Sequence, residues 1–239
     1  MNQCRGRALC SNEPSAGVNN ASNGALESAS DHRATPVSLG TTIMACVYRD
    51  GVILGADSRT STGSYVANRV TDKLTRLTDR IYVCRSGSAA DTQNLSMYVV
   101  WFLEQHAMEL GEEPDVLTAA KLLAKLAYEN KSALQAGLIV AGWDEKRGGQ
   151  VYSIPLGGTM VETKLAIGGS GSAYITSLTD ATYRDDMTED ECRAWVQRSV
   201  SHAAARDASS GGCVRTVAIR KEGVNRHFLE GDKLPFMLC

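Results

Sequence analysis

The sequence predicts an α+β fold of four layers, an α-β-β-α sandwich of two antiparallel sheets packed face to face with a helix pair on each outer face. Three observations support it. The segments run in the order strands, two helices, strands, two helices, strands. Strands follow strands through short turns and do not alternate with helices as in a parallel sheet. Neither a repeat nor a linker divides residues 41–239, so we expect a single domain there.

The first strands are predicted by apolar, β-branched runs. Residues 42–48 and 52–57 are joined through Asp50-Gly51, a hairpin turn signal. Residues 64–70 and 73–77 give weaker strand patterns. Residues 80–86 (RIYVCRS) give a strong pattern that stops at Gly87.

From Ala89 the apolar period becomes helical. The repeating positions, which end before Gly111, are Leu95, Tyr98, Val99, Phe102, Leu103 and His106. His106 therefore lies on the apolar face, where a core histidine is favoured over a catalytic base. A second helix is predicted over residues 116–134, with Asp115 as its N-cap.

The second half repeats this order. Residues 137–141 and 150–154 form a predicted hairpin, and residues 160–167 add a strand. A third helix follows Gly169-Ser170-Gly171. A fourth begins at Thr188 with a capping box to Glu191, and it is expected to bury Cys192, Trp195, Val196, Ser199 and Val200. Residues 214–220 and 225–229 close the chain as a strand pair.

Composition narrows the function. The 239 residues carry a net charge of −2 and no basic run, which argues against nucleic-acid binding. No apolar run is long enough to span a bilayer, so no membrane partner is expected. The seven cysteines are scattered without a CxxC pair, which indicates a reducing compartment with ordinary thiols and disfavours structural zinc. We expect neither a metal nor a cofactor.

Residues 1–40 differ from the rest of the chain. They are rich in Asn, Ser, Ala and Gly and contain no Phe, Trp or Tyr. They have no apolar stretch for a secretory signal, and Glu13, Glu27 and Asp31 disfavour a mitochondrial transit peptide. We expect residues 1–40 to be a flexible propeptide that is removed.

The junction between Gly40 and Thr41 is the predicted cleavage site. Cutting there would expose Thr41 as a new N-terminus, with a hydroxyl nucleophile and an amine base on one residue. Gly40 has no Cβ to crowd attack by the Thr41 hydroxyl on the preceding carbonyl.

Other chemistries fit less well. None of the four histidines (His32, His106, His202, His227) lies in a recognisable nucleophile motif. The loop at residues 168–172 precedes a helix, as phosphate loops do, but it matches neither GxGxxG, nor a P-loop, nor GxSxG. A tight turn, with a supporting role for Ser170, is the favoured interpretation.

Several polar and glycine motifs cluster at predicted strand ends, and together they resemble a known family. They are Thr41-Thr42-Ile43, Gly55-Ala56-Asp57-Ser58-Arg59, Lys73, Ser86-Gly87-Ser88-Ala89-Ala90-Asp91, Gly169-Ser170-Gly171, and Arg206-Asp207 with Ser210-Gly211-Gly212. Over residues 41–239 the chain resembles a catalytic β-subunit of the eukaryotic 20S proteasome. Residues 63–73 and 84–87 most resemble the caspase-like, first β-type subunit.

The resemblance implies an N-terminal-nucleophile hydrolase fold and a threonine-type endopeptidase made as a zymogen. Thr41 is then the nucleophile and its freed α-amine the base, since an amine with a pKa of about 8 suits neutral pH. Lys73 would stay cationic and ease ionisation of Thr41, held by Asp57. Gly87 would supply the oxyanion-hole N–H. Ser170, Asp207 and Ser210 match the supporting network.

The resemblance also implies a preference for acidic residues on the amino side of the cut bond (P1). Arg85 lies two residues from Gly87, so both face one side of a strand. Its guanidinium would favour a P1 carboxylate. Thr60, Thr71 and Ala89 match the other pocket-lining positions.

The implied partners are the other α- and β-type subunits in stacked seven-membered rings, polypeptide substrates that are typically ubiquitin-tagged, and, indirectly, regulatory particles. The implied location is the cytoplasm and nucleus. A non-catalytic β-subunit remains an alternative, although such subunits commonly lose the Thr, the lysine or the Gly that this chain keeps. A free-standing amidohydrolase or a binding module around the glycine loop is less favoured.

Overall fold

A computed structural model describes residues 39–235, which fall within one compact unit, Val37–Cys239. The prediction of a propeptide at residues 1–40 therefore lies outside the described residues, except at Leu39 and Gly40. No helix of the described part is long and apolar enough to cross a membrane.

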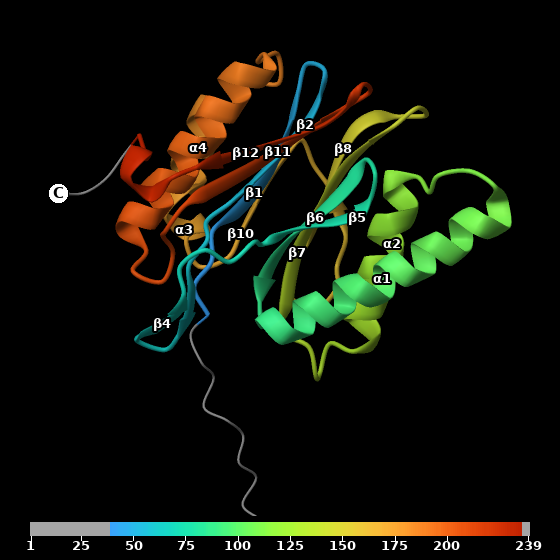
Figure 1. The fold of residues 1–239 in the computed structure, drawn as a ribbon, viewed down its shortest axis with the longest axis horizontal. Coiled ribbons are helices and arrows are strands. Elements are labelled where there is room, and N and C mark those ends of the chain that lie inside the picture. The colour runs from blue at the N-terminus through green and yellow to red at the C-terminus, as the bar shows by residue number, and fades with distance from the viewer. Residues whose placement is uncertain (1–38, 236–239) are drawn as a thin grey trace, which may run out of the picture. The chain divides into compact units, whose positions relative to one another are not determined.

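Two five-stranded antiparallel sheets form the centre of the fold (Figure 1). The first has the order β10-β1-β2-β11-β12, and the second β5-β6-β7-β8-β9. The strands of the first sheet are β1 (Ile43–Tyr48), β2 (Gly51–Ala56), β10 (Leu165–Gly168), β11 (Val214–Arg220) and β12 (Gly223–Leu229). The strands of the second sheet are β5 (Leu74–Thr78), β6 (Ile81–Gly87), β7 (Ala136–Asp144), β8 (Gly148–Ile154) and β9 (Val161–Glu162). A separate ribbon consists of β3 (Thr60–Thr62) and β4 (Tyr65–Asn68).

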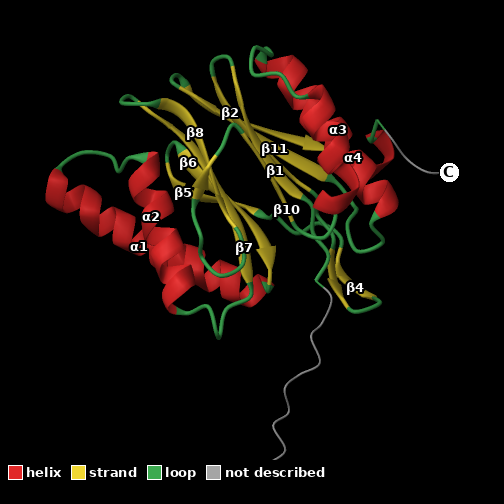
Figure 2. Ribbon diagram, turned by 180° about the vertical axis from the view of Figure 1, so that it is seen from behind, coloured by secondary structure: helices red, strands yellow, loops and turns green. Residues whose placement is uncertain are grey.

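A helix pair covers the outer face of each sheet (Figure 2). The second sheet carries α1 (Ala89–Leu110) and α2 (Val116–Glu129). The first carries α3 (Ser172–Thr182) and α4 (Glu189–Arg206), followed near the end of the described chain by a short 3-10 turn, Gly231–Lys233. The predicted four-layer α+β sandwich is confirmed.

Each of the three layer boundaries has its own apolar core. One lies between the sheets, one between the second sheet and α1 and α2, and one between the first sheet and α4. Ile43 and Met44 are neighbours on β1, yet Ile43 packs between the sheets and Met44 packs toward α4. Alternate strand residues point to opposite faces, so a sheet buried on both faces reads as a continuous apolar run.

Three predicted boundaries are wrong. Residues 160–167 form two short strands, because β9 pairs with β8 while β10 pairs with β1, and the chain crosses between the sheets there. The helix predicted to reach residue 134 ends at Glu129. The weak strand predicted at residues 64–70 is only β4, paired with β3, which the sequence pattern did not indicate.

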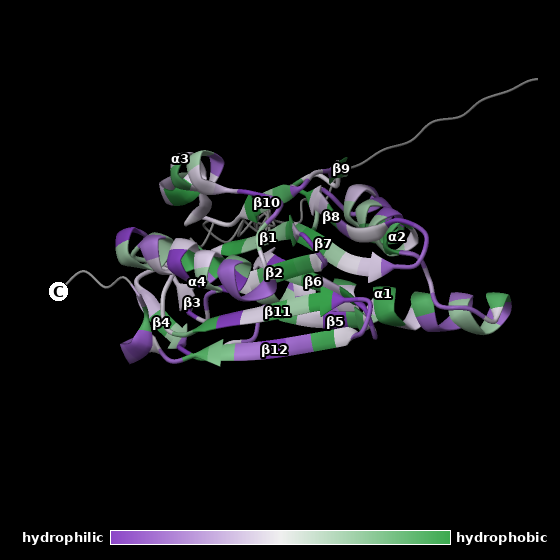
Figure 3. Cartoon of the chain, turned by 90° about the horizontal axis from the view of Figure 1, so that it is seen from above, coloured by the Kyte–Doolittle hydropathy of each residue, from purple (hydrophilic) through white to green (hydrophobic). Residues whose placement is uncertain are grey.

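The apolar face predicted for α1 is only partly buried. Leu95, Val99 and Leu103 lie in the core, but Tyr98 is 64% exposed and Phe102 is 41% exposed. Hydrophobic residues along α1 are visible in Figure 3. His106 is half-buried, so it is not the core histidine expected. On α4, Trp195 is likewise half-buried, while its four predicted companions are buried.

Candidate active site

Strand ends bring the predicted catalytic residues together at one end of the sandwich. Thr41 lies two residues before β1, and Asp57 directly follows β2. The β1–β2 hairpin aligns them, because Asp57 N–H donates to the Thr42 carbonyl at 3.1 Å, one step beyond the Ile43–Ala56 pair. Lys73 comes directly before β5, in the other sheet, so the site bridges the two sheets.

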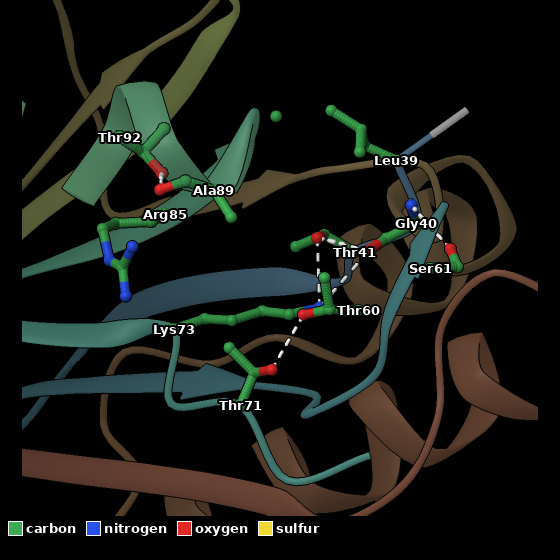
Figure 4. Close-up of a pocket in the computed structure, with 11 residues that line it drawn as sticks. Leu39, Gly40, Thr41, Thr60, Ser61, Thr71, Lys73, Arg85, Ala89 and Thr92 are labelled. Carbon is green, nitrogen blue, oxygen red and sulfur yellow. Dashed lines mark hydrogen bonds between the residues drawn. The ribbon is translucent and has the colours of Figure 1, made fainter. Parts of the chain in front are cut away.

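Lys73 contacts both Thr41 and Asp57 (Figure 4 shows the contact with Thr41). Its Nζ donates to Thr41 Oγ1 at 3.1 Å and to Asp57 Oδ1 at 2.7 Å. All three residues are buried, with exposed fractions of 5% or less. An ammonium this close to a hydroxyl oxygen favours the alkoxide, which makes Thr41 a stronger nucleophile.

Burial and charge act on Lys73 in opposite directions. Burial lowers the pKa of the Lys73 ammonium below its ordinary value, and the Asp57 carboxylate works to raise it. Asp57 is itself held by the backbone, since the N–H groups of Thr42, Arg59 and Gly211 all donate to its oxygens. Asp57 is thus a fixed, hydrogen-bonded counter-charge for Lys73.

A second polar network lies on the other side of Thr41. The hydroxyls of Ser170 and Ser210 both donate to Asp207 Oδ2 at 2.6 Å. Thr41 N–H donates to Ser170 Oγ at 3.1 Å. Ser170, from the loop before α3, therefore contacts the atom that becomes an amine if the chain is cut before Thr41. Asp207, which caps the end of α4, holds the Ser170 hydroxyl.

The Gly40–Thr41 peptide bond lies within this network. Thr41 Oγ1 donates to the Gly40 carbonyl oxygen at 2.5 Å, and Lys73 Nζ is 3.3 Å from the same oxygen. A Cβ added at Gly40 would lie 2.0 Å from the Ser209 carbonyl oxygen. The structure therefore leaves no room for a side chain at the predicted cleavage position.

Gly87 ends β6 with a φ of 98°, a left-handed conformation that favours glycine. A Cβ there would lie 2.2 Å from the Gln135 carbonyl oxygen. Gly87 lines the same pocket as Thr41, which makes its position compatible with the predicted oxyanion role.

The pocket beside Thr41 contains all four predicted specificity residues, Arg85, Thr60, Thr71 and Ala89. The hydroxyl of Thr60 donates to Thr71 Oγ1 at 2.8 Å. Arg85 Nη2 donates to the Asp72 carbonyl oxygen at 2.8 Å, whereas its buried Nε has no hydrogen-bond partner. Burial lowers the pKa of Arg85, and the Asp72 charge opposes this. A half-buried guanidinium that donates to a backbone carbonyl oxygen keeps its charge and is suited to bind an acidic group.

Sequence reasoning missed three residues of the site. Thr42 Oγ1 donates to Ser210 Oγ at 2.9 Å, and Ser61 Oγ accepts from Gly40 N–H at 3.4 Å. Thr92, on α1, lines the pocket. Ser61 belongs to β3, whose three residues are too few to give a strand pattern. Thr42 could have been found as the residue paired with Asp57 in the predicted hairpin.

The glycine loop at residues 168–172 is hydrogen-bonded to Thr41. Its Gly171 N–H donates to the Thr41 carbonyl oxygen at 3.1 Å, which braces the chain around the hydroxyl. Within residues 39–235, no group of three or more His, Cys, Asp or Glu side chains is placed to hold a metal ion.

A threonine hydroxyl beside a buried lysine, at one end of a four-layer sandwich, defines a hydrolase-like class of site. The sequence profile of the family described as "Proteasome subunit" matches residues 37–219. Proteasome subunit beta type-6 of Arabidopsis thaliana is 57% identical over 83% of this chain and 85% of that protein. Proteasome subunit beta type-1 of Saccharomyces cerevisiae is 52% identical, over 82% and 91%. Proteasome subunit beta type-9 of Rattus norvegicus is 45% identical, over 87% and 94%. The chain belongs to the proteasome subunit family.

Proposed function

We propose that this chain is a threonine endopeptidase subunit of the 20S proteasome core that cleaves after acidic residues once residues 1–40 are removed. The observation that carries the proposal is the 3.1 Å contact between Lys73 Nζ and Thr41 Oγ1. It joins a buried cation to the one hydroxyl that cleavage after Gly40 would place on an N-terminal residue.

In the cleaved chain, the Thr41 α-amine takes the proton of the Thr41 hydroxyl, directly or through a water. The oxygen then attacks the substrate carbonyl carbon while Lys73 stabilises the developing alkoxide. The scissile C–N bond breaks as the proton held by the amine passes to the leaving nitrogen, and water hydrolyses the ester that is left on Thr41. Ser170, Ser210 and Asp207 would hold the amine, because Ser170 Oγ already lies 3.1 Å from Thr41 N. Gly87 N–H would stabilise the oxyanion.

Removal of the leader uses the same atoms. Thr41 Oγ1 attacks the Gly40 carbonyl carbon, an ester C–O bond forms, and the C–N bond breaks as the nitrogen takes up a proton. Water then hydrolyses the ester and frees the Thr41 hydroxyl. Lys73 Nζ, 3.3 Å from the Gly40 oxygen, is positioned to stabilise the charge that develops there. Until this happens Thr41 has no free amine, so the uncut chain is a zymogen.

Acidic specificity is supported by the pocket. Arg85 makes no ion pair there among the described residues, so its charge is available to a P1 Glu or Asp carboxylate. A carboxylate held by a guanidinium is a charge-assisted bond, about twice as strong as a neutral one.

We also propose an assembly, a substrate class and a cellular location for this chain. The named relatives are β-type proteasome subunits, so we expect this chain to assemble with other α- and β-type subunits into stacked seven-membered rings. Its substrates would be unfolded, typically ubiquitin-tagged polypeptides, delivered with the help of regulatory particles in the cytoplasm and nucleus.

Arg85→Met in assembled particles tests the specificity. Hydrogen bonds to charged groups contribute about 1.5–3 kcal/mol, so kcat/KM for a Glu-P1 peptide should fall about 10- to 100-fold while a Leu-P1 peptide is little affected. Arg80→Met is the matched control. Arg80 directly precedes β6, at the end of the strand far from Gly87, and it pairs with Glu113. An unchanged Glu preference in Arg85→Met would contradict the pocket assignment.

A further inference from the structure

Thr71, the middle residue of the segment 70–72, lines the specificity pocket (Figure 4). Arginines from three different strands bond this short segment. Arg215, on β11, donates to the carbonyls of residues 71 and 70 at 2.9 and 3.0 Å. Arg85 donates to the Asp72 carbonyl, and Arg226, on β12, pairs with the Asp72 carboxylate at 2.6 Å. The segment is therefore held by charged groups that are distant in the sequence.

The Asp72 carboxylate acts electrostatically on Arg85. Its charge raises the pKa of Arg85 against the effect of burial, so its field reaches the guanidinium. Its two oxygens are already used, Oδ1 by Leu74 N–H at 2.9 Å and Oδ2 by Arg226. Left without a counter-charge, Asp72 would offset the attraction of Arg85 for an acidic side chain and repel that side chain directly.

Arg226 is placed to supply that counter-charge. Its guanidinium lies 5.9 Å from the centre of the Tyr82 ring, a cation–π distance. Its side chain is 45% exposed, on the hydrophilic middle of β12 (Figure 3), and it does not line the pocket. With Arg226 present, the group of Arg85, Asp72 and Arg226 carries a net charge of +1; without it, the net charge is zero.

We propose that Arg226 strengthens the preference for acidic P1 residues by neutralising Asp72, so that the positive charge of Arg85 acts on the substrate undiminished. Arg226 is a positioning and charge-setting residue that acts through Asp72. This inference rests on the proposed function, because it presupposes an acidic P1 substrate.

The experiment compares kcat/KM for peptides that differ only in Glu or Gln at P1, in assembled particles carrying Arg226→Met. The Glu:Gln ratio should fall about 3- to 10-fold, mainly through KM for the Glu peptide, since a partly screened charge is removed. The loss should shrink at high ionic strength. Arg226→Lys, which keeps the charge, should keep the ratio.

A second substitution separates charge from structure. Asp72→Asn can still accept from Leu74 N–H, and Asp72→Asn combined with Arg226→Met should restore the Glu:Gln ratio. A purely structural role would lower both peptides together and would not be rescued. Arg220→Met is the matched control, because Arg220 is also 45% exposed and pairs with Glu189, a residue outside the pocket.

The outcomes are distinct. If wild-type particles cleave preferentially after Glu and Arg226→Met behaves like Arg220→Met, this inference is wrong and the proposed function stands. A Glu:Gln ratio that falls in Arg226→Met but is not restored by the double substitution also overturns it. If the wild-type chain shows no Glu preference at all, the proposed acidic specificity fails, and the inference fails with it.

Discussion

At Lys73, burial lowers the pKa of the ammonium while Asp57, 2.7 Å away, works to raise it. Lys73→Met removes the cation but leaves Asp57 buried. Breaking a buried pair costs about 3–5 kcal/mol, so the melting temperature should drop and cleavage activity should be lost. Lys73→Met with Asp57→Asn should recover much of the stability and none of the activity. Thermal denaturation and peptide assays would check both; recovery of activity in the double variant would contradict the role of Lys73.

The same residue sets a pH dependence. Because burial lowers the pKa of Lys73 below 10.5, the folded protein releases this proton at a lower pH than the unfolded chain does. The catalytic rate should therefore decline on the alkaline side before pH 10.5. Lys73→Arg keeps its charge beyond about pH 12 and should move this decline upward, whatever its maximal rate. A pH–rate profile of intact particles measures this, and an identical alkaline decline in both proteins would count against the assignment.

The space around Gly40 has no room for a side chain. A Cβ there would lie 2.0 Å from the Ser209 carbonyl oxygen, so Gly40→Val should displace the peptide from Thr41 Oγ1 and block leader removal. The purified chain should then retain residues that precede Thr41. Leu39→Ala, one residue away and also at the pocket, is the control and should be processed. Complete processing of Gly40→Val would show that the contact with Ser209 does not matter.

At the scale of elements, strand ends were predictable from the sequence where turn residues and apolar runs agree. The β1–β2 hairpin and β6 follow from their apolar runs and turn chemistry. The sheet that a short strand joins cannot be predicted in this way, because pairing depends on distant parts of the chain. Only two residues separate β9 from β10, yet the two strands belong to different sheets. The exposure of Tyr98 on α1 likewise cannot be obtained from a helical period alone.

The close packing of α4 on β2 gives an element-scale prediction. A Cβ added at Gly55 would lie 2.3 Å from Val196 Cγ1. Gly55→Ala should therefore cost about 1–3 kcal/mol through overpacking, seen as a melting temperature lower by roughly 3–10 °C. Removing the opposing methyl groups with Val196→Ala in the same chain should recover part of the loss. If the losses of stability in the two single variants simply add in the double variant, residues 55 and 196 are not in steric conflict and the prediction is wrong.

For the whole molecule, the order of the segments was enough to predict four layers, because each amphipathic element must bury its apolar side against another. The site was harder to predict from the sequence. Its residues lie up to 170 positions apart, from Gly40 to Ser210, and the resemblance of whole motifs, more than any single spacing, brought them together. The bonds from Lys73 to both Thr41 and the Gly40 carbonyl emerge only when the two sheets are packed.

Assembly is a prediction at this scale. A β-type subunit should co-purify with other proteasome subunits in a particle many times heavier than the chain itself, whereas a free-standing amidohydrolase would have a mass near 25.6 kDa or a small multiple of it. Analytical ultracentrifugation of the chain purified from its own cells distinguishes them. A small, active species would contradict the proposed setting.

The most direct test of the central claim is the intact mass of this chain in assembled particles, for the wild type and for Thr41→Ala. We predict that the wild-type chain begins at Thr41 and that the Thr41→Ala chain still carries Gly40, because the nucleophile that cuts the bond is gone. A wild-type chain that cleaves peptides but begins elsewhere, or a Thr41→Ala chain cut after Gly40, would contradict the account.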